Sequence, residues 1–136
     1  NFNVDNFTSY IFNECKIKEI NSLNTEIDKK LNWAQVKKLN NNSLFTIGGH
    51  SHEHKSFTTM SYPTFKQQVN KSLMLLKKNI NQEIFHYSYP EGQKIDFNNK
   101  ISIYLKNKNI ICCPSATYGF NTKNTDLFKL KRIPII

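Results

Sequence analysis

Long apolar runs are absent from this 136-residue sequence, and that absence excludes one class of protein. No stretch approaches the roughly 20 apolar residues that cross a bilayer, so no transmembrane segment is expected. No signal peptide is visible at Asn1, and an initiating Met is also lacking. The chain is therefore expected to be a fragment or a processed product.

Cysteine is scarce as well, with Cys15, Cys112 and Cys113 making an odd count. A disulfide framework is not expected from this number. Cys112 and Cys113 end the apolar run that starts at Ile110, which is typical of a buried strand. Buried thiols of this kind act as small hydrophobic side chains and fit a reducing compartment.

Arginine is nearly missing, because Arg132 is the only arginine among 19 Lys and Arg residues. Proteins that read nucleic-acid sequence use arginine for base edges and phosphates, so specific nucleic-acid binding is not expected. The net charge of +9 comes from lysines spread along predicted helices and loops without a dense cluster. Such a basic surface can still attract an anionic glycan or a membrane face.

What the chain does contain is an alternation of helical and extended patterns. Trp33, Val36 and Leu39 recur at helical steps, and Trp33 is expected in the core. Pro63 suits the first turn of a helix whose apolar stripe runs from Phe65 to Ile80. Further helices are expected within residues 3–20 and 97–106, and strands at 44–47, 84–89, 110–113 and 130–135. This order predicts an α/β fold with parallel strands and covering helices.

Residues 48–54, Gly-Gly-His-Ser-His-Glu-His, are the most informative stretch. If the chain turns helical after the glycines, His50 and His54 fall on one helix face. Two imidazoles on one face can bind one divalent metal. The plain alternative for such a spacing is a solvated helix face. The position at the carboxyl end of a predicted strand, where α/β proteins place their sites, favours the metal.

Four motifs occur in a fixed order: Leu31–Leu39 with Trp33 and Val36, Phe45–His54, Tyr87–Gly92, and Thr125–Ile135. Together they resemble the polysaccharide deacetylase family (NodB-homology domains, carbohydrate esterase family 4) over about residues 31–136. The resemblance implies a partial or distorted (β/α) barrel. Residues 1–136 would then form a single domain, the later part of such a barrel.

The resemblance also implies a chemistry and its residues. Family members hold a divalent metal, usually Zn²⁺, and hydrolyse N-acetyl or O-acetyl groups, here expected on a bacterial surface polysaccharide. Carried over, His50 and His54 would be metal ligands, and the backbone N–H of Glu91 would stabilise the oxyanion. The remaining candidates are supporting residues Ser51 and His52 and substrate-binding residues Tyr89 and Pro90. Tyr89 and Pro90 could equally serve only to shape a turn.

This sequence departs from the family pattern in ways that leave a second function open. The family's Asp-Asp pair, which supplies the third ligand and the general base, is absent, so it either precedes Asn1 or is lost. Ser88 stands where the family commonly has arginine, and no late Leu-x-His motif is found. The alternative is a catalytically inactive module that binds glycan or a protein partner. Oligomeric state is left open, as is location between the bacterial cytoplasm and the cell envelope.

Overall fold

The structure of the chain is a computed structural model, which describes residues 4–16 and 29–135. The chain divides into two compact units, Asn1–Leu31 and Asn32–Ile136. The first unit holds helix α1, Val4–Glu14, which confirms a helix in this part of the chain. Residues 17–20 of the expected helix lie outside the described residues. The single domain expected over residues 1–136 stays a prediction.

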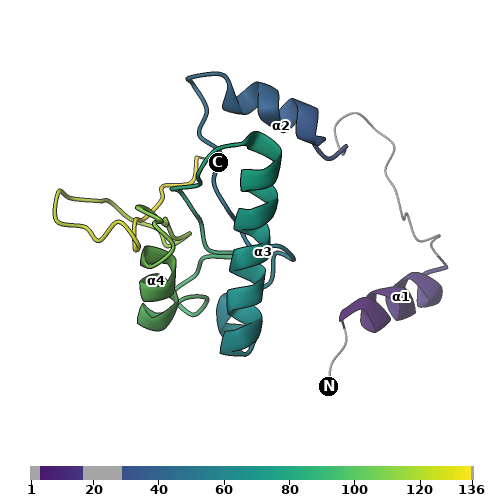
Figure 1. Cartoon of the computed structure of the whole chain (residues 1–136). Coiled ribbons are helices and arrows are strands. Elements are labelled where there is room, and N and C mark those ends of the chain that lie inside the picture. The colour runs from purple at the N-terminus through teal and green to yellow at the C-terminus, as the bar shows by residue number, and fades with distance from the viewer. Residues whose placement is uncertain (1–3, 17–28, 136) are drawn as a thin grey trace. The chain divides into compact units, whose positions relative to one another are not determined.

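The described part of the second unit contains three α-helices, which Figure 1 labels. They are α2 (Trp33–Asn40), α3 (Tyr62–Ile80) and α4 (Asn99–Lys106). All three were expected from the sequence at these places. A short 3₁₀ helix, η1 (Phe57–Thr59), was not. No helix in the described ranges is long and apolar enough to cross a membrane.

Asparagine stands at five of the six ends of α2, α3 and α4. The side chains of Asn32 and Asn98 accept backbone N–H groups of the first turns of α2 and α4. These are N-caps, which satisfy donors that the helix itself leaves unpaired. Asn81 ends α3 in the left-handed conformation with φ of 57°, which asparagine tolerates better than most residues. Asn41 and Asn107 end the other two helices.

The core lies between α3, α4 and the extended segments of the second unit. The rings of Phe65 and Tyr104 meet edge to face at 5.2 Å, which joins α3 to α4. The predicted apolar stripe of α3 is confirmed at Phe65, Val69 and Ile80, which are all buried. The core position expected for Trp33 is wrong, because α2 buries none of its residues and Trp33 is 42% exposed. The core cluster comprises Phe57, Phe65, Val69, Tyr87, Tyr89, Ile101, Leu105, Ile110, Cys113 and Phe128.

The expected strands are confirmed only in part, as single parallel bridges, and no longer strand forms in the described ranges. The expected strand at 44–47 contains no bridge, and Gly49 and Tyr118 pair outside the expected strands. Gly49 pairs with Tyr87, His86 with Cys112, and Tyr118 with Arg132. The parallel direction agrees with the prediction, whereas the strand lengths do not. One physical reason is that prolines at positions 90 and 114 follow the second and third segments and have no N–H to continue the pairing.

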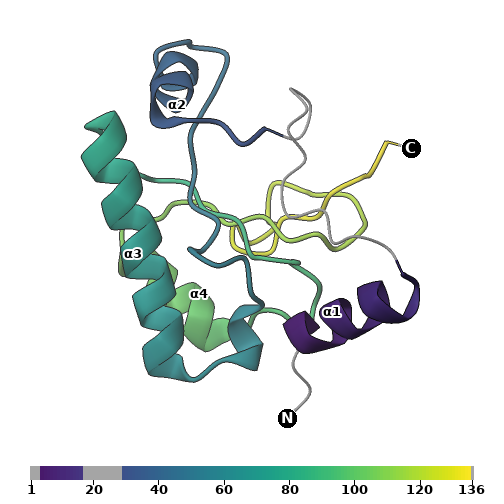
Figure 2. The ribbon, with the colours of Figure 1, turned by 90° about the vertical axis from the view of Figure 1, so that its right-hand side faces the viewer.

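The extended segments present two different faces. Tyr87, Tyr89 and Cys113 point into the core beneath α3 and α4, which lie on the same side of these segments in Figure 2. Alternate residues point the other way, because side chains along extended backbone alternate between faces. They line an open depression of about 310 Å³ and include His50, Gly48, His86, Ser88, Cys112 and Pro114. His50 thus borders an open hollow opposite the packed core.

Candidate active site

The histidine motif forms a loop rather than a helix. Residues 50–56 contain no helical turn, so the helical placement of the two ligands expected from their spacing is wrong. Ser51 and His54 both have positive φ, 60° and 55°, and the Ser51 Oγ accepts the His54 N–H at 2.8 Å. This closed turn still brings the rings of His50 and His54 together, with centroids 4.7 Å apart. The pairing was predicted, and the loop achieves it by a different geometry.

A chain of hydrogen bonds connects this loop to α3. The Ser51 N–H donates to the Tyr87 hydroxyl at 2.8 Å, and that hydroxyl lies 2.9 Å from the Ser72 Oγ. Ser72 in turn donates to the Val69 carbonyl at 2.8 Å, so the Tyr87 hydroxyl is the donor toward Ser72. Tyr87 is 2% exposed, and each of its polar contacts is satisfied. The loop is therefore fixed from the buried side.

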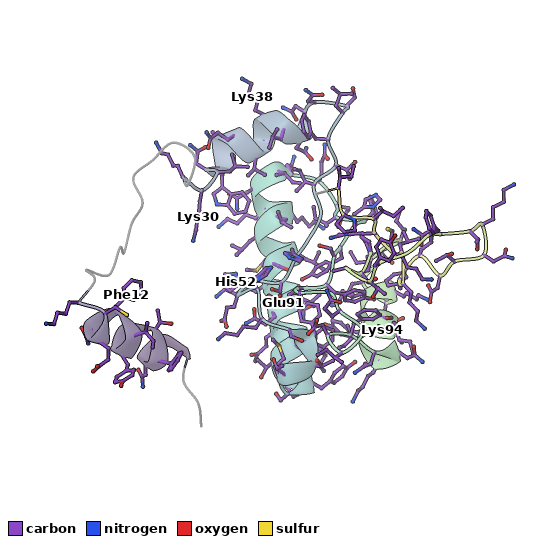
Figure 3. All side chains as sticks on the ribbon, turned by 180° about the vertical axis from the view of Figure 1, so that it is seen from behind. Phe12, Lys30, Lys38, His52, Glu91 and Lys94 are labelled. Atoms are coloured by element: carbon purple, nitrogen blue, oxygen red, sulfur yellow. The ribbon has the colours of Figure 1, made fainter. Side chains whose placement is uncertain are left out.

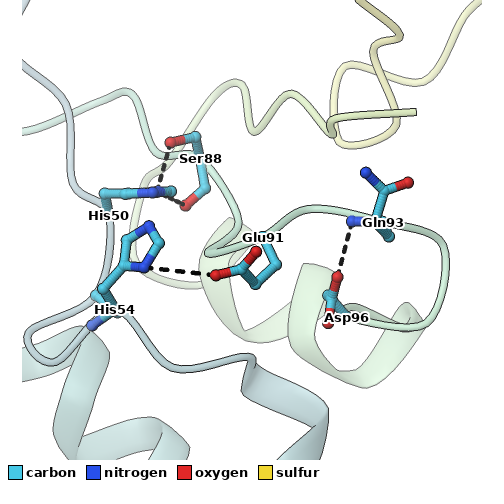
Figure 4. A network of polar contacts seen from close by, with 7 residues as sticks. His50, His54, Ser88, Glu91, Gln93 and Asp96 are labelled. Carbon is cyan, nitrogen blue, oxygen red and sulfur yellow. Dashed lines mark hydrogen bonds and ion pairs between the residues drawn. The ribbon is translucent and has the colours of Figure 1, made fainter. Parts of the chain in front are cut away.

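Both candidate ligands have one ring nitrogen held by the protein, as Figure 4 shows. The His50 Nδ1 lies 3.0 Å from the Ser88 carbonyl oxygen and 2.8 Å from the Ser88 Oγ. The His54 Nδ1 lies 3.6 Å from a carboxylate oxygen of Glu91. A carbonyl or carboxylate at Nδ1 favours the tautomer with hydrogen on that nitrogen. The Nε2 atoms of both rings are then left with a free lone pair.

This donor chemistry fits two of the ligands of a divalent metal. Imidazole nitrogen suits zinc and its neighbours, and second partners at Nδ1 are typical of metal-binding histidines. A catalytic zinc normally has three protein ligands. Within residues 4–16 and 29–135, no group of three or more His, Cys, Asp or Glu side chains is arranged to hold an ion. A complete site thus needs a further ligand besides His50 and His54.

The turn at residues 90–92 places an unpaired N–H beside the histidines. The Gly92 N–H donates to the Pro90 carbonyl at 2.6 Å, and Glu91 between them has a positive φ of 59°. Such a tight turn is strained for a residue with a side chain, and strain of this kind is often found at functional sites. The described residues provide no acceptor for the Glu91 N–H. This backbone donor is available to a ligand, as its proposed oxyanion role requires.

The other predicted residues have different surroundings. Tyr89 is 3% exposed, stacks on Phe97 at 4.3 Å, and donates its hydroxyl to the Phe128 carbonyl. Pro90 is also buried. These positions favour the alternative in which the two residues shape the turn. His52 is exposed and separate from the paired rings, and its supporting role stays a prediction.

Sequence reasoning missed three contributors: the Tyr87 hydroxyl, the Ser88 acceptors and the Glu91 carboxylate. The first could have been suspected, since alternation within 84–89 turns Tyr87 toward the core, where its hydroxyl needs partners. Ser88 was treated only as a departure from a motif. Nothing in the sequence indicates that residues 38 positions apart, His50 and Ser88, are hydrogen-bonded.

The buried Tyr87 hydroxyl makes stability depend on alkaline pH. Burial raises the pKa of Tyr87 to about 12, from about 10 in an unfolded chain. The unfolded state therefore loses this proton first, and folding stability should fall as pH rises from about 10 to about 12. Tyr87→Phe should flatten that fall and, at neutral pH, cost about 1–2 kcal/mol by removing the acceptor of the Ser51 N–H.

Urea unfolding of both proteins at a series of pH values between 8 and 11 measures this difference. Tyr89→Phe is the matched control, because it removes another buried hydroxyl whose pKa is also raised by burial but which does not contact the histidine loop. Identical pH dependence in the natural protein and Tyr87→Phe would contradict the assignment.

The chain matches known proteins at the level of family and fold. A sequence model of the family described as "Polysaccharide deacetylase" matches residues 6–110. No curated protein sequence matches. The matched range starts earlier than the resemblance drawn from the motifs and ends before the fourth motif.

Solved structures of several deacetylases are similar to this chain. The Streptococcus pyogenes deacetylase PplD in complex with acetate has a TM-score of 0.71 and 18% identity over 96% of this chain. The BpsB deacetylase domain from Bordetella bronchiseptica has a TM-score of 0.66 and 15% identity over 85% of this chain. BC0361, a polysaccharide deacetylase from Bacillus cereus, has a TM-score of 0.64 and 17% identity over 96% of this chain. The chain spans 58%, 53% and 43% of those three proteins.

These likenesses show a fold of the deacetylase type. The single parallel bridges and the hollow opposite the core agree with a part of a (β/α) barrel, in which the inner face lies opposite the helices. A closed barrel is not seen in the described residues.

Proposed function

Because the chain belongs to the polysaccharide deacetylase family, we propose that it contributes the histidine half of a metal-dependent deacetylase site. The observation that carries the proposal is the pairing of His50 and His54, with the His50 Nδ1 hydrogen-bonded to Ser88 and the His54 Nδ1 3.6 Å from a carboxylate oxygen of Glu91. The substrate would be a bacterial surface polysaccharide with N-acetyl or O-acetyl groups. Zn²⁺ is the expected ion, because two imidazoles suit it well.

Each residue has a distinct task in this proposal. His50 and His54 would hold the ion, which when bound polarises the acetyl carbonyl and activates a water. The Glu91 N–H would donate to the oxygen on which negative charge develops. The Ser88 acceptors and the Glu91 carboxylate would orient the two imidazoles. The depression of about 310 Å³ beside His50 offers room for an acetylated sugar.

Acetate release tests the function. The chain as the cell makes it, supplied with Zn²⁺, should release acetate from N-acetylated or O-acetylated bacterial glycans, and a chelator should stop the reaction. Restoring the ion should restore the rate, because the ion and not the fold was removed. Absence of acetate release from every such glycan, with binding retained, would overturn the proposal in favour of the inactive glycan-binding module.

A further inference from the structure

The basic charge is not spread evenly, contrary to the expectation from the sequence. Three lysines, Lys94, Lys129 and Lys131, line one pocket of about 370 Å³, which we call the lysine pocket. No acidic side chain lines it. In the described ranges none of these three lysines has a carboxylate or an aromatic ring as a partner, whereas Lys77 and Lys106 pair with carboxylates. The three charges are available to a ligand.

Two parallel extended segments build one wall of the lysine pocket. The Ser115 N–H donates to the Leu130 carbonyl at 2.8 Å, and the Arg132 N–H donates to the Thr117 carbonyl at 2.9 Å. Alternation of side chains along such segments puts Lys129 and Lys131 on the same face. Ser115 and Thr117 line the pocket with them, and Asn98 at the start of α4 faces them. The lining is mainly apolar and includes Phe97, and the lysine, serine, threonine and asparagine side chains add positive charge and groups that can form hydrogen bonds.

The backbone of Lys131 is fixed by two hydrogen bonds. The Asn121 side chain accepts the Lys131 N–H at 2.9 Å and donates to the Lys131 carbonyl at 2.9 Å. The Lys131 stem lies against the backbone of Gly119, where an added Cβ would come within 2.8 Å of the Lys131 Cδ. A fixed backbone at Lys131 limits the freedom that binding must remove.

The lysine pocket adjoins the turn that carries Glu91. Lys94 follows Glu91 by three residues, and Figure 3 labels both on the same unit. The Gly92 carbonyl accepts the Ala116 N–H at 2.8 Å, which ties this turn to the pocket wall. Asp96, the acid nearest in sequence, is buried, accepts the Gln93 N–H and does not line the pocket. The turn that carries Glu91 and the lysine pocket are therefore built from neighbouring segments of one unit.

We propose that the lysine pocket binds an anionic substituent, a carboxylate or a phosphate, on the glycan whose acetyl group lies at the histidine loop. The identification of a glycan rests on the proposed function, and the charge of the ligand rests on the pocket itself. Lysine ammonium groups are compact point charges that suit such substituents without reading bases. The substrate is then an acidic acetylated polysaccharide rather than a neutral one.

Calorimetric binding of defined sugars tests the proposal without needing catalysis. A hyaluronan hexasaccharide carries both acetyl groups and carboxylates, and its carboxyl-reduced form is the neutral match. A comparison of N-acetylglucosamine 6-phosphate with N-acetylglucosamine tests whether a phosphate is bound instead of a carboxylate. We expect at least one charged probe to bind about tenfold more tightly than its neutral match, with an affinity that falls as salt is raised.

The double variant Lys129→Gln/Lys131→Gln should remove the preference for charged over neutral sugars. The control Lys71→Gln/Lys78→Gln loses the same charge on α3 and should keep the preference. All four lysines are exposed, so both variants should fold, and circular dichroism checks this. Three results would overturn the proposal. Charged and neutral probes could bind equally, or both double variants could lose the preference equally. A single-stranded DNA oligomer could also bind more tightly than the sugars and lose that binding in Lys129→Gln/Lys131→Gln. Charged-sugar preference without acetate release would leave it standing while the deacetylase function fails.

Discussion

Replacing Gly49 by alanine is expected to destabilise the fold by about 3 kcal/mol and to disturb the histidine loop. An alanine Cβ at this position would lie 2.3 Å from the Tyr87 Cε2 and 2.5 Å from the Tyr87 Cδ2. The ring cannot withdraw easily, because Tyr87 is buried and its hydroxyl contacts Ser51 and Ser72. Gly49 itself is fixed by the bond from its N–H to the His86 carbonyl at 2.9 Å.

Urea unfolding monitored by circular dichroism measures the loss. Tyr87→Leu provides the control, because a smaller side chain makes room for the new methyl group. In that background, Gly49→Ala should cost about 1 kcal/mol or less, and the difference gives the coupling between the two residues. If Gly49→Ala costs the same in both backgrounds, the close approach of the Tyr87 ring is not what requires glycine here.

His50→Ala is expected to abolish metal binding and acetate release with little change in stability. The ring is exposed and close to the His54 ring, so its loss removes a ligand but little packing. His52→Ala, two residues along in the same loop, should retain the metal. Ser88→Ala should have an intermediate effect of about tenfold on metal affinity, because the Ser88 carbonyl still holds the His50 Nδ1.

Elemental analysis after zinc loading gives the metal content of each variant. About one ion per chain is expected for the natural protein and for His52→Ala, and close to none for His50→Ala. A natural protein that stays free of metal, or a His50→Ala variant that keeps it, would contradict the assignment of this loop as part of a metal site.

The helices of this chain could be predicted well because their signals are local. For α3, Pro63 in the first turn and the stripe from Phe65 to Ile80 agree with the observed bounds. Strand length was predicted poorly, since it depends on how many backbone hydrogen bonds form between segments that are distant in the sequence. Trp33 shows the same limit: its spacing predicts a buried face, but the packing of α2 leaves it exposed.

The pairing of His50 and His54 could be predicted from the sequence, whereas the residues that hold the two rings could not. Residue type and spacing indicate the two histidines that follow Gly48-Gly49. Their placement depends on the positive φ of Ser51 and His54, which no periodicity indicates. The lysine pocket was missed because Lys94 and Lys129 are far apart in the sequence and meet only when the segment around residue 116 pairs with residues 92 and 130.

Deamidation of the asparagine caps should affect the two ends of these helices in opposite ways. Asparagine is thermally labile, and loss of its amide nitrogen leaves a negatively charged carboxylate. At Asn32 and Asn98 an aspartate product would still cap, and its charge would favour the positive end of the helix dipole. At Asn41, Asn81 and Asn107 the same charge would meet the negative end. Slow deamidation should therefore spare the starts of α2 and α4 while it loosens the ends of all three helices.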